Sequence, residues 1–129
     1  MSEYFEHIEL PTGVHHIVWM DNSNESAKAY QHLLEGLLSD YSDTDITTIR
    51  IIHDYRQVSF HPFLQVLGSV KWLSSLYPDI TDRIAYIIRD VSIEILMDNM
   101  AQVSHDQIKR LLFKPKEEQE AIVWLLNDD

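Results

Sequence analysis

Cysteine is missing from all 129 residues, which excludes disulfides, thiolate catalysis and cysteine-ligated zinc and is compatible with a reducing compartment. Glycine occurs only three times, at positions 13, 36 and 68, so the chain has no glycine-rich loop of the kind that cradles a phosphate. No apolar run approaches the roughly 20 residues that a membrane helix needs. The chemistry that remains depends on carboxylates, hydroxyls and seven histidines.

Basic residues are also scarce. Ten lysines and arginines stand against 21 aspartates and glutamates, which gives a formal net charge of -11. Nucleic-acid binding draws much of its free energy from cations that displace condensed counterions, so this charge argues against a nucleic-acid partner. The acidic start, MSEYFEHIEL, lacks the basic region and apolar run of a secretion signal. We expect a cytoplasmic protein without membrane insertion, with one domain over residues 1–129.

The first two apolar runs predict a β-hairpin. Tyr4 to Leu10 and Val14 to Met20 are rich in aromatic and β-branched residues, as strands are. They flank Pro11, Thr12 and Gly13, and proline followed by glycine between two such runs is typical of a tight turn.

Strand and helix periodicities alternate in the rest of the chain. Asn22, with Glu25 three residues later, predicts the start of a helix that fades near Asp40. Pro62 predicts the first position of a second helix, which Pro78 ends. The other expected elements are strands at Ile46 to Ile52, Arg83 to Ile88 and Ile108 to Phe113, a helix at Ile93 to Val103, and a last helix opened by Pro115 with Glu117 and Glu118 near its positive dipole end.

This alternation predicts an α/β fold. Its sheet is mixed, with an N-terminal β-hairpin followed by repeated α-β units with right-handed crossovers and a C-terminal helix. Consecutive apolar residues, such as Ile51 with Ile52 and Ile87 with Ile88, indicate a sheet buried on both faces. Either the helices cover both faces or a second subunit covers one of them, which makes a homodimer the simplest closure.

A polar cluster follows the most β-branched strand. His53, Asp54 and Arg56 come directly after Ile46 to Ile52. Open α/β sheets place their binding surfaces outside the carboxyl ends of the strands. We expect Asp21 and Asp90, which follow neighbouring strands, to flank this cluster.

Several landmarks resemble the STAS family (sulfate-transporter and anti-sigma-factor antagonist) and its SpoIIAA-like branch. They are the hairpin, the strand that closes in DYRQVSF, the strand TDRIAYIIRD and the ending RLLFKPKEEQEAIVWL. The resemblance covers about Glu9 to Leu126 and implies a domain that binds a partner kinase. In that family a serine at the start of the helix after the central strand is the phosphorylation switch.

The phosphorylation motif of the family is missing here. Pro62, Phe63, Leu64 and Gln65 occupy the positions that match the family's Asp-Ser-Ser/Thr-Gly motif. Proline removes a backbone N–H that would bind a phosphate. Ser59 lies nearby, but a serine three residues before a helix-opening proline is more simply a capping or turn residue. We therefore predict no phosphorylation switch in this loop.

Histidine and carboxylate residues raise the question of a metal site. His53, Asp54 and His61 could meet in one loop, and zinc and iron sites use such ligands in threes. However, His15 and His16 are consecutive in a strand and point to opposite faces, and no predicted helix carries two histidines four residues apart. Hydrogen bonds from these histidines to loop carbonyls or carboxylates are the simpler interpretation, so we predict no metal and no cofactor.

These patterns together favour a noncatalytic interaction domain that binds a protein partner at the carboxyl edge of its sheet. A carrier or sensor of a small apolar molecule is the first alternative, and a closed pocket lined by Trp19, Leu67 or Tyr86 would favour it. The second is an enzyme that uses His53, Asp54 or His61, although no glycine-rich elbow exposes Ser59 as a nucleophile. The predicted contact residues are Asp21, His53, Asp54, Arg56, Ser59, His61, Phe63 and Asp90.

Overall fold

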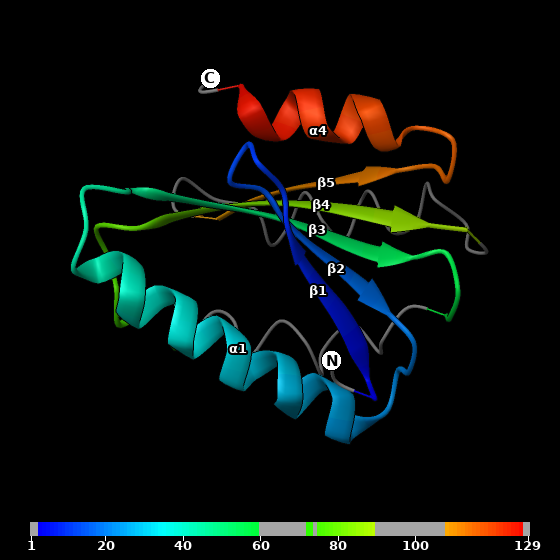
Figure 1. Cartoon of the computed structure of the whole chain (residues 1–129), viewed down its shortest axis with the longest axis horizontal. Coiled ribbons are helices and arrows are strands. Elements are labelled where there is room, and N and C mark those ends of the chain that lie inside the picture. The colour runs from blue at the N-terminus through cyan, green and yellow to red at the C-terminus, as the bar shows by residue number, and fades with distance from the viewer. Residues whose placement is uncertain (1–2, 60–71, 74, 90–107, 128–129) are drawn as a thin grey trace.

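In the part of the chain that the structure describes, five strands form one mixed sheet, with one helix on each face (Figure 1). The computed structural model describes residues 3–59, 72–73, 75–89 and 108–127. The elements within them are β1 (Phe5–Glu9), β2 (His15–Trp19), α1 (Asn24–Ser42), β3 (Thr48–Tyr55), β4 (Thr81–Ile88), β5 (Ile108–Phe113) and α4 (Glu118–Leu126). The α/β class and the mixed sheet predicted from the sequence are confirmed. The helices expected at Pro62 and at Ile93 to Val103 lie outside the described residues.

The strands are ordered β1-β2-β3-β4-β5, and only the first pair is antiparallel. In the predicted hairpin turn, the Leu10 N–H donates to the Val14 carbonyl at 2.8 Å. Gly13 has a φ of 88°, in the left-handed region that glycine adopts at little cost. The hairpin is therefore confirmed. Because β2 to β5 are parallel, their carboxyl ends meet at one edge of the sheet.

Helix α1 covers one face of the sheet. Ser23, not Asn22, caps it: the Ser23 Oγ accepts from the Ser26 N–H at 3.2 Å, and the helix continues to Ser42, beyond the predicted end at Asp40. The hydroxyl of Ser23 is itself held by Asp21, at 2.6 Å. The core on this face contains three residues of the helix and most of the inward side chains of the sheet, among them Tyr30, Leu34, Leu38, Ile17, Trp19, Ile49, Ile51, Tyr55, Ile84 and Tyr86.

Helix α4 packs on the opposite face. It begins at Glu118, three residues after Pro115, and buries Ala121 and Leu125 against a smaller core that includes Val14, Ile52, Ala85 and Ile87. Two arginines of the sheet bind its last turn: Arg50 Nε donates to the Leu125 carbonyl at 2.7 Å, and Arg83 Nε donates to the Trp124 carbonyl at 2.9 Å. Cations at this end of a helix also oppose its dipole.

The central strand β3 is longer at its carboxyl end than the sequence pattern indicates. His53 and Asp54 are not in a loop but in the strand, which pairs with β4 as far as Tyr55 opposite Ile88. Both polar side chains are buried and have a hydrogen-bond partner, so the strand can continue through them. They point to opposite faces of the sheet, as consecutive strand residues do.

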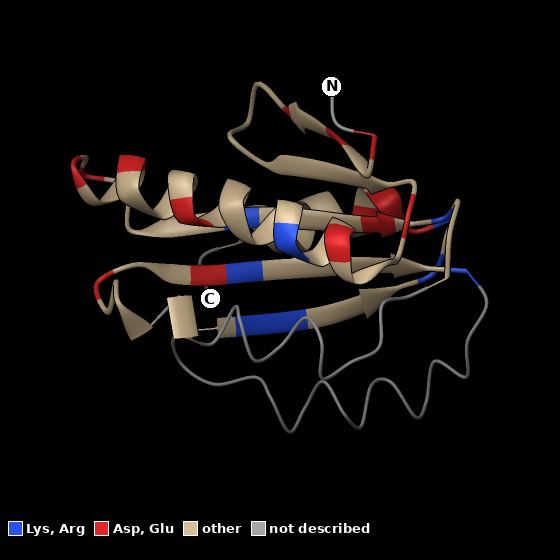
Figure 2. Cartoon of the chain, turned by 90° about the horizontal axis from the view of Figure 1, so that it is seen from below, with Lys and Arg blue, Asp and Glu red and all other residues tan. Residues whose placement is uncertain are grey.

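Charge is distributed differently at the two ends of the parallel strands (Figure 2). Acidic residues mark the end of α1 and the turn before β4, and the segments 43–47 and 77–80 contain no lysine or arginine. Basic residues follow the carboxyl ends of β3, β4 and β5, namely Arg56, Arg89, Lys114 and Lys116. Neither described helix combines the length and the apolar character needed to cross a membrane.

Candidate functional site

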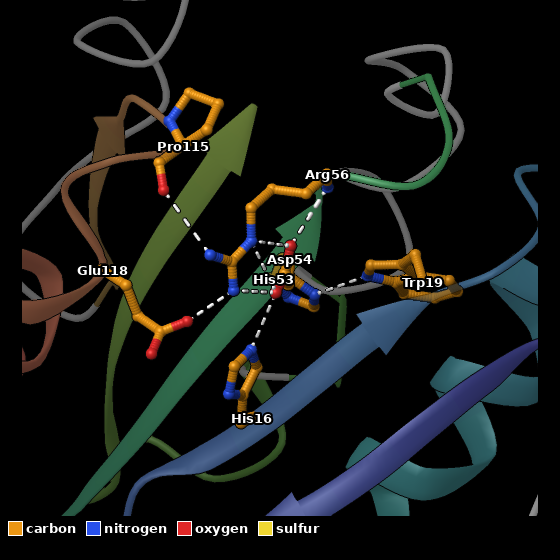
Figure 3. Close-up of polar contacts among 7 residues, drawn as sticks. All are labelled: His16, Trp19, His53, Asp54, Arg56, Pro115 and Glu118. Atoms are coloured by element: carbon orange, nitrogen blue, oxygen red, sulfur yellow. Dashed lines mark hydrogen bonds and ion pairs between the residues drawn. The ribbon is translucent and has the colours of Figure 1, made fainter. Parts of the chain in front are cut away.

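Four charged or polar side chains from different elements meet at the carboxyl edge (Figure 3). Asp54 lies near the end of β3, Arg56 follows that strand, His16 lies in neighbouring β2, and Glu118 begins α4. We call these four residues the edge network. Strand alternation directs both His16 and Asp54 toward the face that α4 covers.

Asp54 is the centre of the edge network. Its carboxylate is only 3% exposed and receives His16 Nε2 at 3.0 Å, Arg56 Nη2 at 2.6 Å, Arg56 Nε at 3.0 Å and the Arg56 backbone N–H at 3.0 Å. Burial opposes ionisation, but the hydrogen bonds from His16 and Arg56 outweigh it and hold the pKa of Asp54 well below its usual range. Asp54 is therefore ionised at neutral pH, and its two oxygens already accept hydrogen bonds from His16 and Arg56.

Arg56 connects the strand end to α4. Its Nη2 bonds to Glu118 Oε1 as well as to Asp54, and its Nη1 lies 3.5 Å from the Pro115 carbonyl. The hydrogen bond to Asp54 raises the pKa of Arg56, burial opposes this, and Glu118 adds to it. The backbone carbonyl of Arg56 in turn accepts from Arg89 Nη1 at 3.1 Å, so the loops after β3 and β4 are also joined.

Asp54 is poorly suited to act as a general base. A general base needs a pKa near the working pH and a free acceptor, and Asp54 has neither. His16, Asp54 and Glu118 each offer a ligand atom within 4.8 Å of the others, which is compatible with a cation. The guanidinium of Arg56 already lies between the two carboxylates and supplies that positive charge. The hydrogen bonds and ion pairs of the edge network are best suited to holding β2, the end of β3 and the start of α4 in fixed positions.

His53 lies on the other side of the sheet, apart from the edge network. It is 1% exposed, and its Nδ1 accepts from Trp19 Nε1 at 3.1 Å. Its ring stacks on Tyr86, with centroids 5.1 Å apart, and meets Tyr30 edge-on at 4.7 Å. His53 and Asp54 therefore cannot act on one ligand together. Trp19 and Tyr86 belong to this aromatic core.

The other predicted contact residues divide into two groups. Asp21 serves the start of α1 by accepting from Ser23, and exposed Ser59 uses its carbonyl to accept from Asn22 Nδ2 at 3.2 Å. His61, Phe63 and Asp90 lie outside the described residues. Of the predicted contact residues, Arg56 and Asp54 therefore lie in direct contact. His53 and Asp54 are buried, so a partner would contact the side chains that cover them and not these two residues themselves.

His16 and Glu118 are the members of the network that the sequence does not indicate. Only the pairing register of β2 with β3 could have indicated His16. Val18 pairs with Asp54, and His16, two residues before Val18, lies on the same face of the sheet. For Glu118, the position at the start of a C-terminal helix suggests only a dipole contact. Comparisons with protein-family models, curated proteins and solved structures found no match for this chain.

Proposed function

We propose that this protein is a noncatalytic interaction domain whose carboxyl sheet edge binds a protein partner. The observation that carries the proposal is the edge network itself. Its charges are bound to one another across β2, β3 and α4, which makes the edge a fixed platform instead of a reactive site. A preorganised surface loses less conformational entropy when a partner binds.

Exposed cations at this edge support an acidic segment as the partner's contact. Arg89, Lys114 and Lys116 are exposed, and no carboxylate of the described residues lies within ion-pair distance of their side chains. In a chain with a net charge of -11, such cations are few. Complementary charges at a rim accelerate association and select the partner.

The resemblance to the SpoIIAA-like branch of STAS is in accord with this proposal. The N-terminal hairpin and the parallel strands that follow it in sequential order support that relationship. The loop after the central strand, where that family carries its switch serine, here begins with Arg56 of the edge network. We propose the interaction role without the phosphorylation switch.

Affinity capture from native cells, followed by mass spectrometry, tests the proposal. The wild type and a charge reversal of the edge, Lys114→Glu with Lys116→Glu, serve as baits. Lys28→Glu, at an exposed position of α1, is the control for a change of charge elsewhere. We expect a stoichiometric partner with the wild type and the control and at least tenfold less with the edge variant. Equal recovery by all baits, or no stoichiometric partner, would contradict the proposal.

A further inference from the structure

A pocket of about 300 Å³ lies at the other end of the sheet, where the parallel strands begin. The end of α1, the segment before β3 and the turn before β4 enclose it. Its lining includes Tyr41, Ile46, Leu76, Tyr77, Asp79 and Ile80. We call it the amino-edge pocket. It shares no residue with the edge network, so it stands independently of the function proposed above.

Backbone hydrogen bonds hold the walls of this pocket in place. The Thr44 N–H donates to the Tyr41 carbonyl at 3.0 Å, and the Ile80 N–H donates to the Tyr77 carbonyl at 3.1 Å across Pro78 and Asp79. The two walls are joined where the Thr81 N–H donates to the Thr47 carbonyl at 2.7 Å. The pocket is therefore formed before any ligand arrives.

The walls offer aromatic and aliphatic surface. Tyr41 and Tyr77 are partly buried and pack against the core below α1, and buried Ile80 lies between that core and the pocket. At the rim, Ile46 is 47% exposed and Leu76 is 55% exposed, so both side chains offer apolar surface to a ligand. Such a lining favours a ligand with an apolar body.

The electrostatic environment of the pocket is negative. Asp79 is part of the lining, and Asp43 is the C-cap residue of α1, whose last turn has no basic residue to offset the negative end of the helix dipole. Burial, followed by the charges of Glu9 and Asp40, raises the pKa of Tyr41. Figure 2 shows acidic residues at the end of α1 and in the turn before β4.

We propose that the amino-edge pocket binds an organic cation, an ammonium or guanidinium group on an apolar body, either as a free small molecule or as a lysine or arginine side chain of a peptide. The faces of Tyr41 and Tyr77 attract a cation through their ring quadrupoles. Asp79 supplies the opposite charge, and Ile46 and Leu76 contact the apolar body. An anion finds no basic residue in the pocket lining.

Amide chemical shifts of the full chain test this assignment with three probes. Phenethylammonium is the free cation, 2-phenylethanol is its neutral counterpart, and a short acetylated peptide with one lysine carries the same charge on a chain. Binding of the ammonium should shift the amides of Thr44, Ile46 and Ile80 in a saturable way. It should be at least tenfold tighter than binding of the alcohol, because only the ammonium gains the charge interactions.

Two substitutions that each remove one negative charge identify the site. Asp79→Asn should weaken ammonium binding about fivefold, the effect of one unit charge at about 4 Å in water. Asp79 is exposed and makes no side-chain hydrogen bond to a described residue, so the fold should persist. Glu120→Gln, exposed on α4, is the control and should change nothing. Tighter binding of the lysine peptide with the same dependence on Asp79 would assign the pocket to a macromolecular ligand. Equal binding of ammonium and alcohol, or unchanged binding in Asp79→Asn, would overturn the proposal.

Discussion

Asp54 combines near-complete burial with a negative charge at neutral pH. This is stable only because four donor atoms, three of them on Arg56, replace the lost water. Asp54→Asn keeps the volume but removes the charge, so Arg56 loses its closest anion. We expect the free energy of unfolding to fall by about 2 kcal/mol, below the usual cost of breaking a buried pair because Arg56 is partly solvated. Urea denaturation measures this; Glu120→Gln should change it by less than about 0.5 kcal/mol. Equal stability of the Asp54→Asn variant and the wild type would show that the network contributes nothing.

Acid sensitivity follows from the same residue. The pKa of Asp54 is lowered in the folded state, so the unfolded chain binds a proton, near pH 3.9, that the folded chain does not. This contribution to stability is complete above that value and is lost as the pH falls through it toward the pKa of the folded state. The Asp54→Asn variant should therefore show a flatter decline of unfolding free energy below about pH 5 than the wild type. Parallel curves for the two proteins would contradict the assignment.

Buried His15, paired with exposed His7, predicts a second pH effect, nearer neutrality. His15 is fully buried, with Nε2 on the Tyr41 hydroxyl and Nδ1 2.9 Å from His7 Nε2, while Glu9 faces it at 3.9 Å. Burial, and then the neighbouring His7, lower the pKa of His15, and burial lowers that of His7. The unfolded chain therefore binds protons first, and stability falls as the pH drops below about 6.5.

The matched variants for this effect are His15→Gln and His32→Gln, the latter at an exposed position of α1. Unfolding free energies at pH 7.5 and pH 5.5 should differ less in His15→Gln than in the wild type. In His32→Gln the difference should match the wild type. The same pH difference in all three proteins would show that His15 is not responsible.

At the scale of elements, α4 is an integral part of the fold. Leu125 is fully buried, whereas Val123, two residues earlier on the same helix, is 64% exposed. Leu125→Ala should lower the free energy of unfolding by about 2 to 4 kcal/mol, since it creates a cavity, and Val123→Ala by less than about 0.5 kcal/mol. Truncation before Pro115 should abolish cooperative unfolding. A truncated chain that melts like the full one would make α4 an appendage.

How far the sequence predicts these elements depends on whether the deciding contacts are local. Gly13 and Pro11 specify the hairpin locally, and β5 has the predicted bounds, Ile108 to Phe113. The end of β3 could not be predicted, because His53 and Asp54 look like loop residues until Trp19 and Arg56 bind them. His16 and Glu118 depend on strand register and on the placement of α4, which local patterns do not contain.

At the scale of the whole molecule, association stays a prediction. Helix α4 covers part of the second face, yet Val123 and Leu126, at 64% and 41% exposure, form an apolar strip on its outer side beside Trp124. A twofold dimer through this strip would bury it. Sedimentation equilibrium at micromolar concentration should show a dimer that Val123→Glu dissociates. A single species of 15.2 kDa at all concentrations would exclude it.

We propose that the carboxyl edge is a fixed, noncatalytic surface for an acidic partner. Titration calorimetry with the captured partner tests it most directly, in the wild type, in Lys114→Glu with Lys116→Glu, and in Lys28→Glu. We predict a Kd at least tenfold higher for the edge variant, within twofold of the wild type for the Lys28→Glu control, and rising with ionic strength for the wild type. A Kd that is the same in all three proteins and insensitive to salt would contradict binding of an acidic partner at this edge.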